Sequence, residues 1–142
     1  MIRTCLAFFL TSVLASTAMA QMSITITKVY EDKTNIAVVP FLWDGASTAP
    51  SEMSNIVVAN LERTGQFAAL PQSDMRSWPT RRESMVFREW RLLDQDFVVI
   101  GRARGLSDDR VEVAYELYDP YREVRILGET LTGSRSQWRE LA

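Results

Sequence analysis

The apolar positions near the start of the chain predict two strands of different kinds. In residues 23–29, Ile24 and Ile26 alternate with polar residues, as in a strand with one apolar face. Residues 36–41 form a continuous apolar run, which is typical of a strand buried on both faces. Pro40 lies near the end of this run, where its missing N–H removes no hydrogen bond from a central ladder.

Helical spacing appears twice in the middle of the chain. Apolar residues at i, i+3 and i+4 from Met53 predict a helix after a loop over 44–50, and Gly65 fits its left-handed C-terminal cap. A short strand or a packed turn is predicted over 67–70. Residues 83–93 predict a second, weaker helix, with an apolar stripe made of Val86, Phe87, Trp90 and Leu93.

The last third of the chain predicts three strands. A buried strand covers 97–101, and two strands at 111–117 and 124–131 follow, the first with one polar face. A helix is predicted to begin at Ser134 or Ser136. The order of strands and helices predicts an α/β fold.

The first 20 residues have the pattern of a secretory signal. Their single charge is Arg3, an apolar stretch follows, and Ala18 and Ala20 supply small residues at the cleavage positions. We expect cleavage after Ala20. A membrane anchor is the alternative, but serines and threonines dilute the stretch. Cys5 lies too far upstream for a lipoprotein signal.

Composition excludes several classes of chemistry. The 142 residues contain no histidine, and Cys5 is the single cysteine. Serine–histidine and cysteine–histidine pairs, histidine-ligated zinc and disulfides in the exported part are therefore excluded. The formal net charge of −2 gives no reason to expect nucleic-acid binding. No later window is apolar for about 20 residues, so no membrane span is expected after signal cleavage.

The remaining acidic and basic residues have ordinary structural interpretations. Asp94 and Asp96 form a D-x-D pattern that can hold a metal, but aspartates between a helix and a strand commonly serve turns. Glu112 and Glu129 could act as paired carboxylates; nearby arginines favour a solvated ion-pair face. The arginines within 76–91 are offset by acids and indicate a solvated helix face. We predict no catalytic residue, metal or cofactor.

Short motifs follow one another in the order of a known family. They are IAVVPF at 36–41, PSEMSNIV at 50–57, LERTGQF at 61–67, VFREW at 86–90 and VAYELYD at 113–119. Their succession resembles the amino-terminal domain of the TolB family of the Tol-Pal system. The resemblance covers essentially all of residues 21–142.

This resemblance implies a mixed five-stranded sheet with flanking helices, similar to an anticodon-binding domain. It also implies a non-enzymatic periplasmic protein–protein interaction domain that supports outer-membrane integrity and cell division. Residues 21–34 would be a partner-binding segment ahead of the domain at 35–142. In the family, the segment that matches its first part binds the carboxy-terminal domain of TolA. The implied contact residues are Gln21, Met22, Ser23, Ile24, Thr25, Ile26 and Thr27.

Two alternatives to this interpretation stay open at the level of sequence. One is an exported regulatory module of the type associated with curli secretion or penicillin-binding-protein activation. The other is a carboxylate-dependent enzyme that uses Asp94 and Asp96 with a divalent metal.

The carboxyl end leads to an expectation about stability. The family continues into a β-propeller that binds Pal, whereas this sequence stops at Ala142, so we expect a truncated domain without Pal binding. Its last helix would be incomplete after Trp138 and Leu141. Losing three or four large buried side chains costs about 5–10 kcal/mol, comparable with the whole stability of a small domain. We therefore expect an exposed apolar patch on the strands around Val98 and Ile36.

Overall fold

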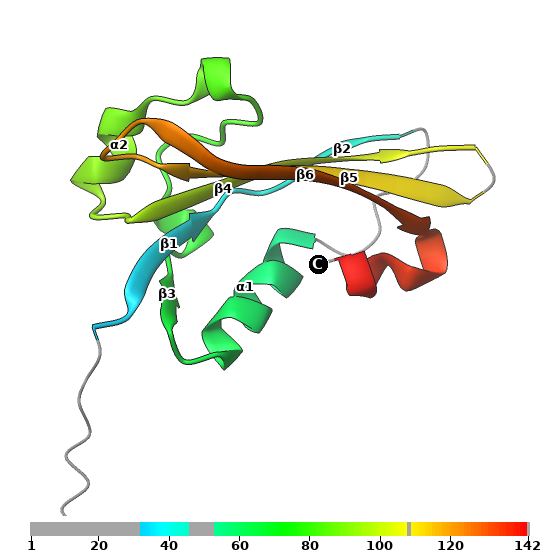
Figure 1. The fold of residues 1–142 in the computed structure, drawn as a ribbon, viewed down its shortest axis with the longest axis horizontal. Coiled ribbons are helices and arrows are strands. Elements are labelled where there is room, and N and C mark those ends of the chain that lie inside the picture. Colours follow the sequence, from blue (N-terminus) through cyan, green and yellow to red (C-terminus); the bar gives the residue numbers. More distant parts are fainter. Residues whose placement is uncertain (1–31, 46–52, 108, 142) are drawn as a thin grey trace, which may run out of the picture.

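The strands of the chain form one mixed sheet with helices on both faces (Figure 1). The computed structural model describes residues 32–45, 53–107 and 109–141. The strands are β1 (Thr34–Val38), β2 (Leu42–Asp44), β3 (Phe67–Ala69), β4 (Phe97–Gly105), β5 (Arg110–Asp119) and β6 (Val124–Ser134). The predicted strand over 23–29 lies outside the described residues.

The main path of the sheet has the order β3-β1-β4-β5-β6. β1 is parallel to β3 and β4, whereas β4, β5 and β6 are antiparallel neighbours. The predicted α/β class and mixed sheet are confirmed. The short β2, which the sequence pattern did not predict, pairs in parallel with residues 102–104 of β4, beyond the end of β1.

The first helix agrees with its prediction and the second does not. α1 (Met53–Arg63) ends before Gly65, whose φ of +76° confirms the left-handed cap. The prediction of one helix over 83–93 is wrong. A 3₁₀ turn, η2 (Arg82–Ser84), is followed by extended backbone at Met85 and then by the short α2 (Phe87–Leu92). The break brings Met85, which is 6% exposed, into the core.

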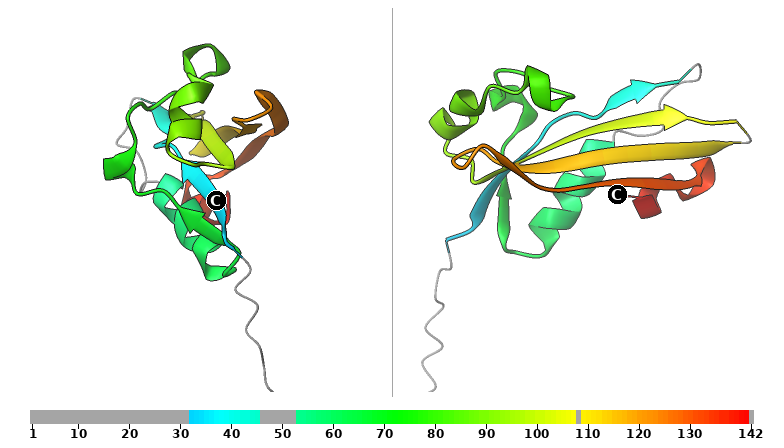
Figure 2. Two further views of the ribbon diagram at one scale, coloured as in Figure 1. Left: turned by 90° about the vertical axis from the view of Figure 1, so that its left-hand side faces the viewer. Right: turned by 45° about the horizontal axis from the view of Figure 1, so that its top comes forward.

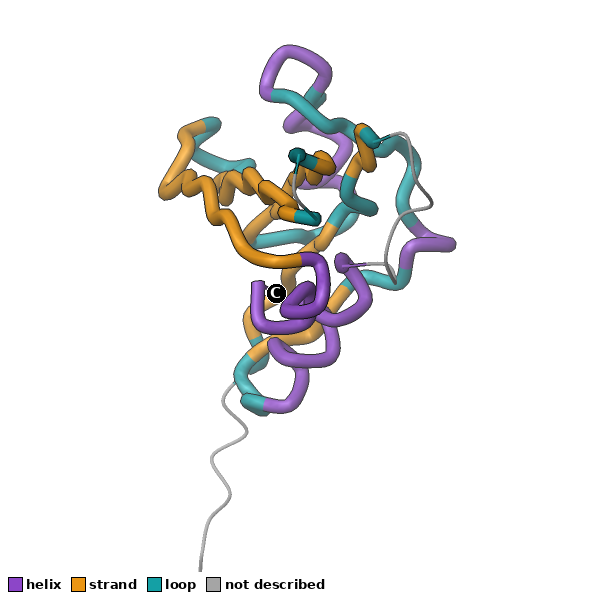
Figure 3. Tube along the Cα trace, turned by 90° about the vertical axis from the view of Figure 1, so that its right-hand side faces the viewer, coloured by secondary structure: helices purple, strands orange, loops and turns teal. Residues whose placement is uncertain are grey.

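The helical segments cover different parts of the two faces. α1 and the 3₁₀ segment η3 (Arg135–Leu141) lie against one face, and Figure 3 shows them close together below the strands. The segment 71–96, which includes η1 (Gln72–Asp74), η2 and α2, packs on the opposite face (Figure 2). The helix predicted to begin at Ser134 or Ser136 is the 3₁₀ segment η3 rather than an α-helix, and its backbone is non-helical at Gln137.

Alternating side chains of β1 and β4 supply the centre of the core on both faces. Ile36, Val38 and Val99 contact residues of α1. The side chains of Ala37, Val98 and Ile100 lie on the opposite face of the sheet from α1. On that side they meet a buried group from the segment 71–96, made of Met75, Met85, Phe87 and Trp90. The predicted burial of the run 36–41 on both faces is confirmed for its residues 36–39.

The expected apolar patch on the strands around Val98 and Ile36 is only partly found. Val98 is fully buried and Ile36 is 4% exposed, because the segment 71–96 and α1 already cover them. An apolar groove of about 460 Å³ does open on the α1 face, between α1 and β6, and Ile36 and Val99 are among the residues that line it. Leu127 on β6 is 40% exposed at this groove.

Two turns flank the beginning of β1. On the β4 side, the Asn35 N–H donates to Asp96 Oδ2 (2.9 Å), the Asn35 side-chain amide donates to the Asp94 carbonyl (2.9 Å), and Asp94 has a φ of +55°. On the β3 side, the Thr34 N–H donates to the Gln66 carbonyl (2.9 Å) just after the Gly65 cap. The segments that precede β3 and β4 both turn at this point, so neither extends alongside the residues before Thr34. Within the described residues, the sheet therefore begins at Thr34 on β1.

We predict that Asp96→Ala lowers the free energy of unfolding by about 1–2 kcal/mol, because a hydrogen bond from the backbone to a carboxylate is lost. Denaturant unfolding measures the change. Adding Mg²⁺ or Mn²⁺ should leave the melting temperature of both proteins unchanged. A metal-dependent rise that disappears in Asp96→Ala would contradict this structural role.

A second prediction concerns Gly101, where the Phe41 ring packs on the strand backbone. A Cβ on Gly101 would lie 2.5 Å from ring atoms of Phe41. Gly101→Ala should therefore lower the free energy of unfolding by about 1–3 kcal/mol through overpacking. Gly105→Ala is the matched control on the same strand, since its Cβ would meet only Trp43 atoms at 3.8 Å. Equal stabilities of the two variants would contradict the prediction.

A third prediction concerns pH. Tyr118 is 2% exposed, and burial, followed by its hydrogen bond to Glu116, raises its pKa to about 12. A free tyrosine has a pKa of about 10, so the neutral phenol is favoured by folding. The resulting stabilisation is complete below pH of about 10 and is lost as the pH rises toward 12. The free energy of unfolding should fall more steeply over this window than in Tyr118→Phe; parallel curves would contradict it.

Candidate functional site

The predicted binding segment, Gln21 to Thr27, lies outside the described residues. The structure instead defines the place where the described chain enters the sheet. Asp32 and Lys33 are exposed, and Thr34 begins β1 between the two flanking turns. Hydrogen bonds on both sides hold Thr34 and Asn35. This is a rigid attachment point for whatever precedes it in the chain.

Asp94 and Asp96 serve that attachment point. The Asp96 carboxylate accepts the Asn35 backbone N–H, and Asp94 Oδ1 accepts the Tyr121 hydroxyl at 3.3 Å. Burial and then the nearby Asp94 carboxylate raise the pKa of Tyr121. No group of three acidic, histidine or cysteine residues within 32–45, 53–107 and 109–141 could hold a metal ion. The aspartates are therefore turn residues, as the turn interpretation predicted.

Glu112 and Glu129 do not come together. In the ladder between β5 and β6, Glu112 lies opposite Thr132, whereas Glu129 lies opposite Tyr115. Since side chains alternate along a strand, the two carboxylates occupy opposite faces of the sheet. Glu112 accepts two hydrogen bonds from Arg104, at 2.7 and 3.1 Å, and these bonds raise the pKa of the Arg104 guanidinium. The predicted ion pairing is confirmed for Glu112.

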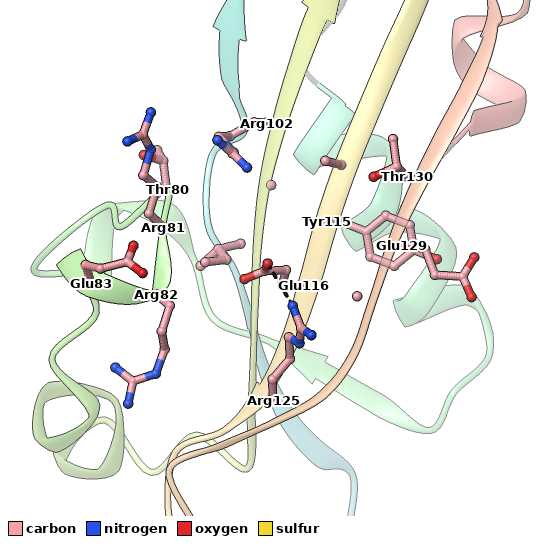
Figure 4. A pocket seen from close by; sticks show the side chains of 14 residues that line it. Thr80, Arg81, Arg82, Glu83, Arg102, Tyr115, Glu116, Arg125, Glu129 and Thr130 are labelled. Atoms are coloured by element: carbon pink, nitrogen blue, oxygen red, sulfur yellow. Dashed lines mark hydrogen bonds and ion pairs between the residues drawn. The ribbon is translucent and has the colours of Figure 1, made fainter.

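A polar hollow of about 530 Å³ lies on the face of β4, β5 and β6 that is opposite α1 (Figure 4). We call it the arginine hollow. Residues 80–83 form one wall, and small residues of the strands, among them Ala114 and Gly128, leave it open. A second hollow of about 320 Å³ shares Arg81, Arg102 and Ala114 with it. Figure 4 shows Arg102 on β4 and Arg81 on the wall beside it.

Most charged groups around the arginine hollow have partners. Arg125 donates to Glu116 at 3.3 Å, and Glu116 also accepts the Tyr118 hydroxyl. Arg82 lies 4.4 Å over the ring centre of Phe87. By contrast, Arg81 and Arg102 form no ion pair with any carboxylate among the described residues.

Sequence reasoning missed the arginine hollow. It assigned the arginines within 76–91 to a solvated helix face, whereas Arg81 and Arg82 belong to a 3₁₀ turn and its flank. The two arginines face strand residues that are distant in sequence, Arg102 and Arg125. No local spacing connects these positions, because only the packing of the wall against β4 brings them together.

None of the described helices is long and apolar enough to cross a bilayer.

Comparisons with known proteins place these features in a family. The family model of the TolB amino-terminal domain matches residues 22–126. The chain is 37% identical to the Tol-Pal system protein TolB of Alcanivorax borkumensis over 93% of its length, and 38% identical to that of Thioalkalivibrio sulfidiphilus over its full length. It spans 30% and 32% of these two relatives.

Solved structures agree with this match. The crystal structure of TolB from Acinetobacter baumannii is similar with a TM-score of 0.63 and 25% identity, over 77% of this chain and 25% of that one. The LpoB C-terminal domain from Salmonella enterica has a TM-score of 0.58 at 11% identity, over 71% of this chain and 82% of that one, and this likeness shows the fold alone. The resemblance found in the motifs is confirmed: the chain belongs to the TolB amino-terminal domain family.

Proposed function

We propose that this chain is a non-enzymatic periplasmic protein–protein interaction domain of the Tol-Pal system, supporting outer-membrane integrity and cell division. The observation that carries the proposal is its identity of 37–38% to proteins named Tol-Pal system protein TolB. The charged groups of the described residues are also consistent with it. Asp94, Asp96 and Glu112 are held in turn and ion-pair contacts rather than gathered around a reaction centre.

The binding element in this proposal is the segment Gln21–Thr27. An extended segment can add a strand to the sheet of a partner, where backbone hydrogen bonds give affinity and alternate side chains give specificity. Ile24 and Ile26 have the spacing of side chains on one face of such a strand. The partner would be the carboxy-terminal domain of a TolA-like inner-membrane protein. The proposal does not extend to Pal.

The attachment point at β1 supports this arrangement. Hydrogen bonds to Asp96, Asp94 and Gln66 hold Thr34 and Asn35 in the sheet. Residues 28–33 separate the binding element from this point, and a fully extended stretch of that length reaches at most about 20 Å. A partner bound to Gln21–Thr27 would therefore be tethered close to the β1 end of the domain.

Deleting residues 21–32 should abolish measurable binding to the TolA carboxy-terminal domain in a calorimetric titration. The double variant Ile24→Ser and Ile26→Ser should weaken binding at least about tenfold, which is 1.4 kcal/mol. The matched control, Thr25→Ala and Thr27→Ala, changes the opposite face of the segment and should stay within about twofold. Unchanged affinity after the deletion would refute the assignment of the segment.

No specific observation favours either of the two alternative functions. The likeness to the LpoB C-terminal domain shows a shared fold and does not favour a regulatory module of another system. A metal-dependent enzyme built on Asp94 and Asp96 is disfavoured, because both side chains are engaged in contacts around β1. Cleavage of the signal after Ala20 stays a prediction.

A further inference from the structure

The arginine hollow combines an open shape with two cations, Arg81 and Arg102, that form no ion pair within the part of the chain that the structure describes. At Gly128 the side chains of Glu116 and Arg125 lie close over the strand, since a Cβ there would lie 3.3 Å from Glu116 Cγ and 3.4 Å from Arg125 Cδ. The space opens at Ala114 of β5, whose small side chain lines both hollows. Arg81 and Arg102 both line this hollow and the adjoining one, so they lie at the boundary that the two hollows share.

The charge distribution selects the kind of ligand. Glu112 and Glu116 are already paired with Arg104 and Arg125, so they offset little of the charge on Arg81 and Arg102. Glu83, Glu129 and Asp44 also line the two hollows and offset part of this charge, but none of them forms an ion pair with Arg81 or Arg102. Guanidinium groups bind carboxylates with two parallel hydrogen bonds, which makes a carboxylate a fitting ligand for them. The two oxygens of one carboxylate can accept hydrogen bonds from both guanidinium groups.

Acidic groups around the hollow disfavour a polyanion. Glu83 and Glu116 line the same space, and the whole chain has a formal net charge of −2. A nucleic acid would place several phosphates against these carboxylates, whereas the N–H groups of a peptide can donate to them. The hydroxyls of Thr80 and Thr130, which also line the hollow, can act as donors or acceptors for a peptide backbone.

We propose that the arginine hollow binds an acidic side chain within an extended peptide segment of a partner protein, with Arg81 and Arg102 holding its carboxylate. This proposal involves other residues than the proposed TolA-binding element. No residue that lines the hollow belongs to β1 or to the turn of Asp94 and Asp96. It therefore gives the domain a second interaction surface, which does not rest on the proposed function of Gln21–Thr27.

The test uses the mature chain, residues 21–142, and the blocked peptide acetyl-Gly-Ser-Glu-Ser-Gly-amide. Two-dimensional ¹H–¹⁵N NMR should show saturable shifts of the backbone amides of Gly101, Ala114 and Gly128, with a Kd in the millimolar range. The same peptide with glutamine in place of glutamate should cause no saturable shift. Raising the salt concentration from about 0.05 M to about 0.5 M should weaken binding, since the contact is electrostatic.

Variants identify the residues that hold the carboxylate. Arg81→Gln and Arg102→Gln should each raise the Kd at least about threefold, and Arg102→Lys should lie between Arg102→Gln and the unchanged protein because lysine keeps only a point charge. Arg110→Gln is the matched control, an exposed arginine of β5 outside both hollows, and should bind normally. Thermal melts verify that all variants are folded.

Three outcomes would overturn the proposal. They are an equal response to the glutamine peptide, unchanged binding in Arg81→Gln and Arg102→Gln, and tighter binding of inorganic phosphate than of the peptide at the same amides. The last would assign the hollow to phosphate anions rather than to a peptide. None of these outcomes depends on TolA, so the proposal fails or stands separately from the function proposed for the amino-terminal segment.

Discussion

Burial of both faces of β1 and β4 is the constraint on which the rest of the structure depends. These two strands lie at the centre of the sheet. Residues 36–38 of β1 and 97–100 of β4 are all apolar, so both faces of the sheet are apolar there. Each face therefore needs its own cover. α1 supplies one and the segment 71–96 supplies the other, with Trp90 fully enclosed between α2 and the strands. The irregular course of 71–96 follows from this demand, since Met75, Met85 and Phe87 must all reach one patch of sheet.

The polar face of the sheet begins where this second cover ends. Along β4, Val98 and Ile100 are buried under the segment 71–96, and the next residues on that side are the exposed Arg102 and Arg104. β5 makes a similar transition in the same region, with Tyr118 buried and Glu116 and Glu112 in ion pairs. The arginine hollow is thus the boundary between a covered and an uncovered part of one sheet face.

Two surfaces with different physical characters follow from this architecture. At the beginning of β1, positive-φ residues on both sides end the sheet, and hydrogen bonds to Asp96 and Gln66 fix the strand that carries the amino-terminal segment. On the face of β4–β6, charged side chains surround an open floor. The first surface suits the tethering of an extended segment, and the second suits recognition of a charged group.

The sequence by itself determined the local features of this protein. Period-two and continuous apolar runs predicted the strands at 36–41, 97–101, 111–117 and 124–131, because the alternation of buried and exposed side chains in a strand is visible within a few residues. For 67–70 the sequence left a strand and a packed turn as alternatives. The cap at Gly65 and the turn role of Asp94 and Asp96 were predicted for the same reason. The order of these elements was enough to indicate the α/β class and the family.

Only the tertiary structure decided what depends on partners distant in the chain. β2 has three residues and no period of its own, and it is a strand because β4 offers it a free edge beyond β1. The second helix was shortened because the core requires Met85, and Val98 is buried because a segment without regular periodicity folds over it. Strand register placed Glu112 and Glu129 on opposite faces, and packing of the 80–83 wall put Arg81 beside Arg102. Local propensity contains no information about these contacts, since each is fixed by the burial of surfaces that meet only after the chain has folded.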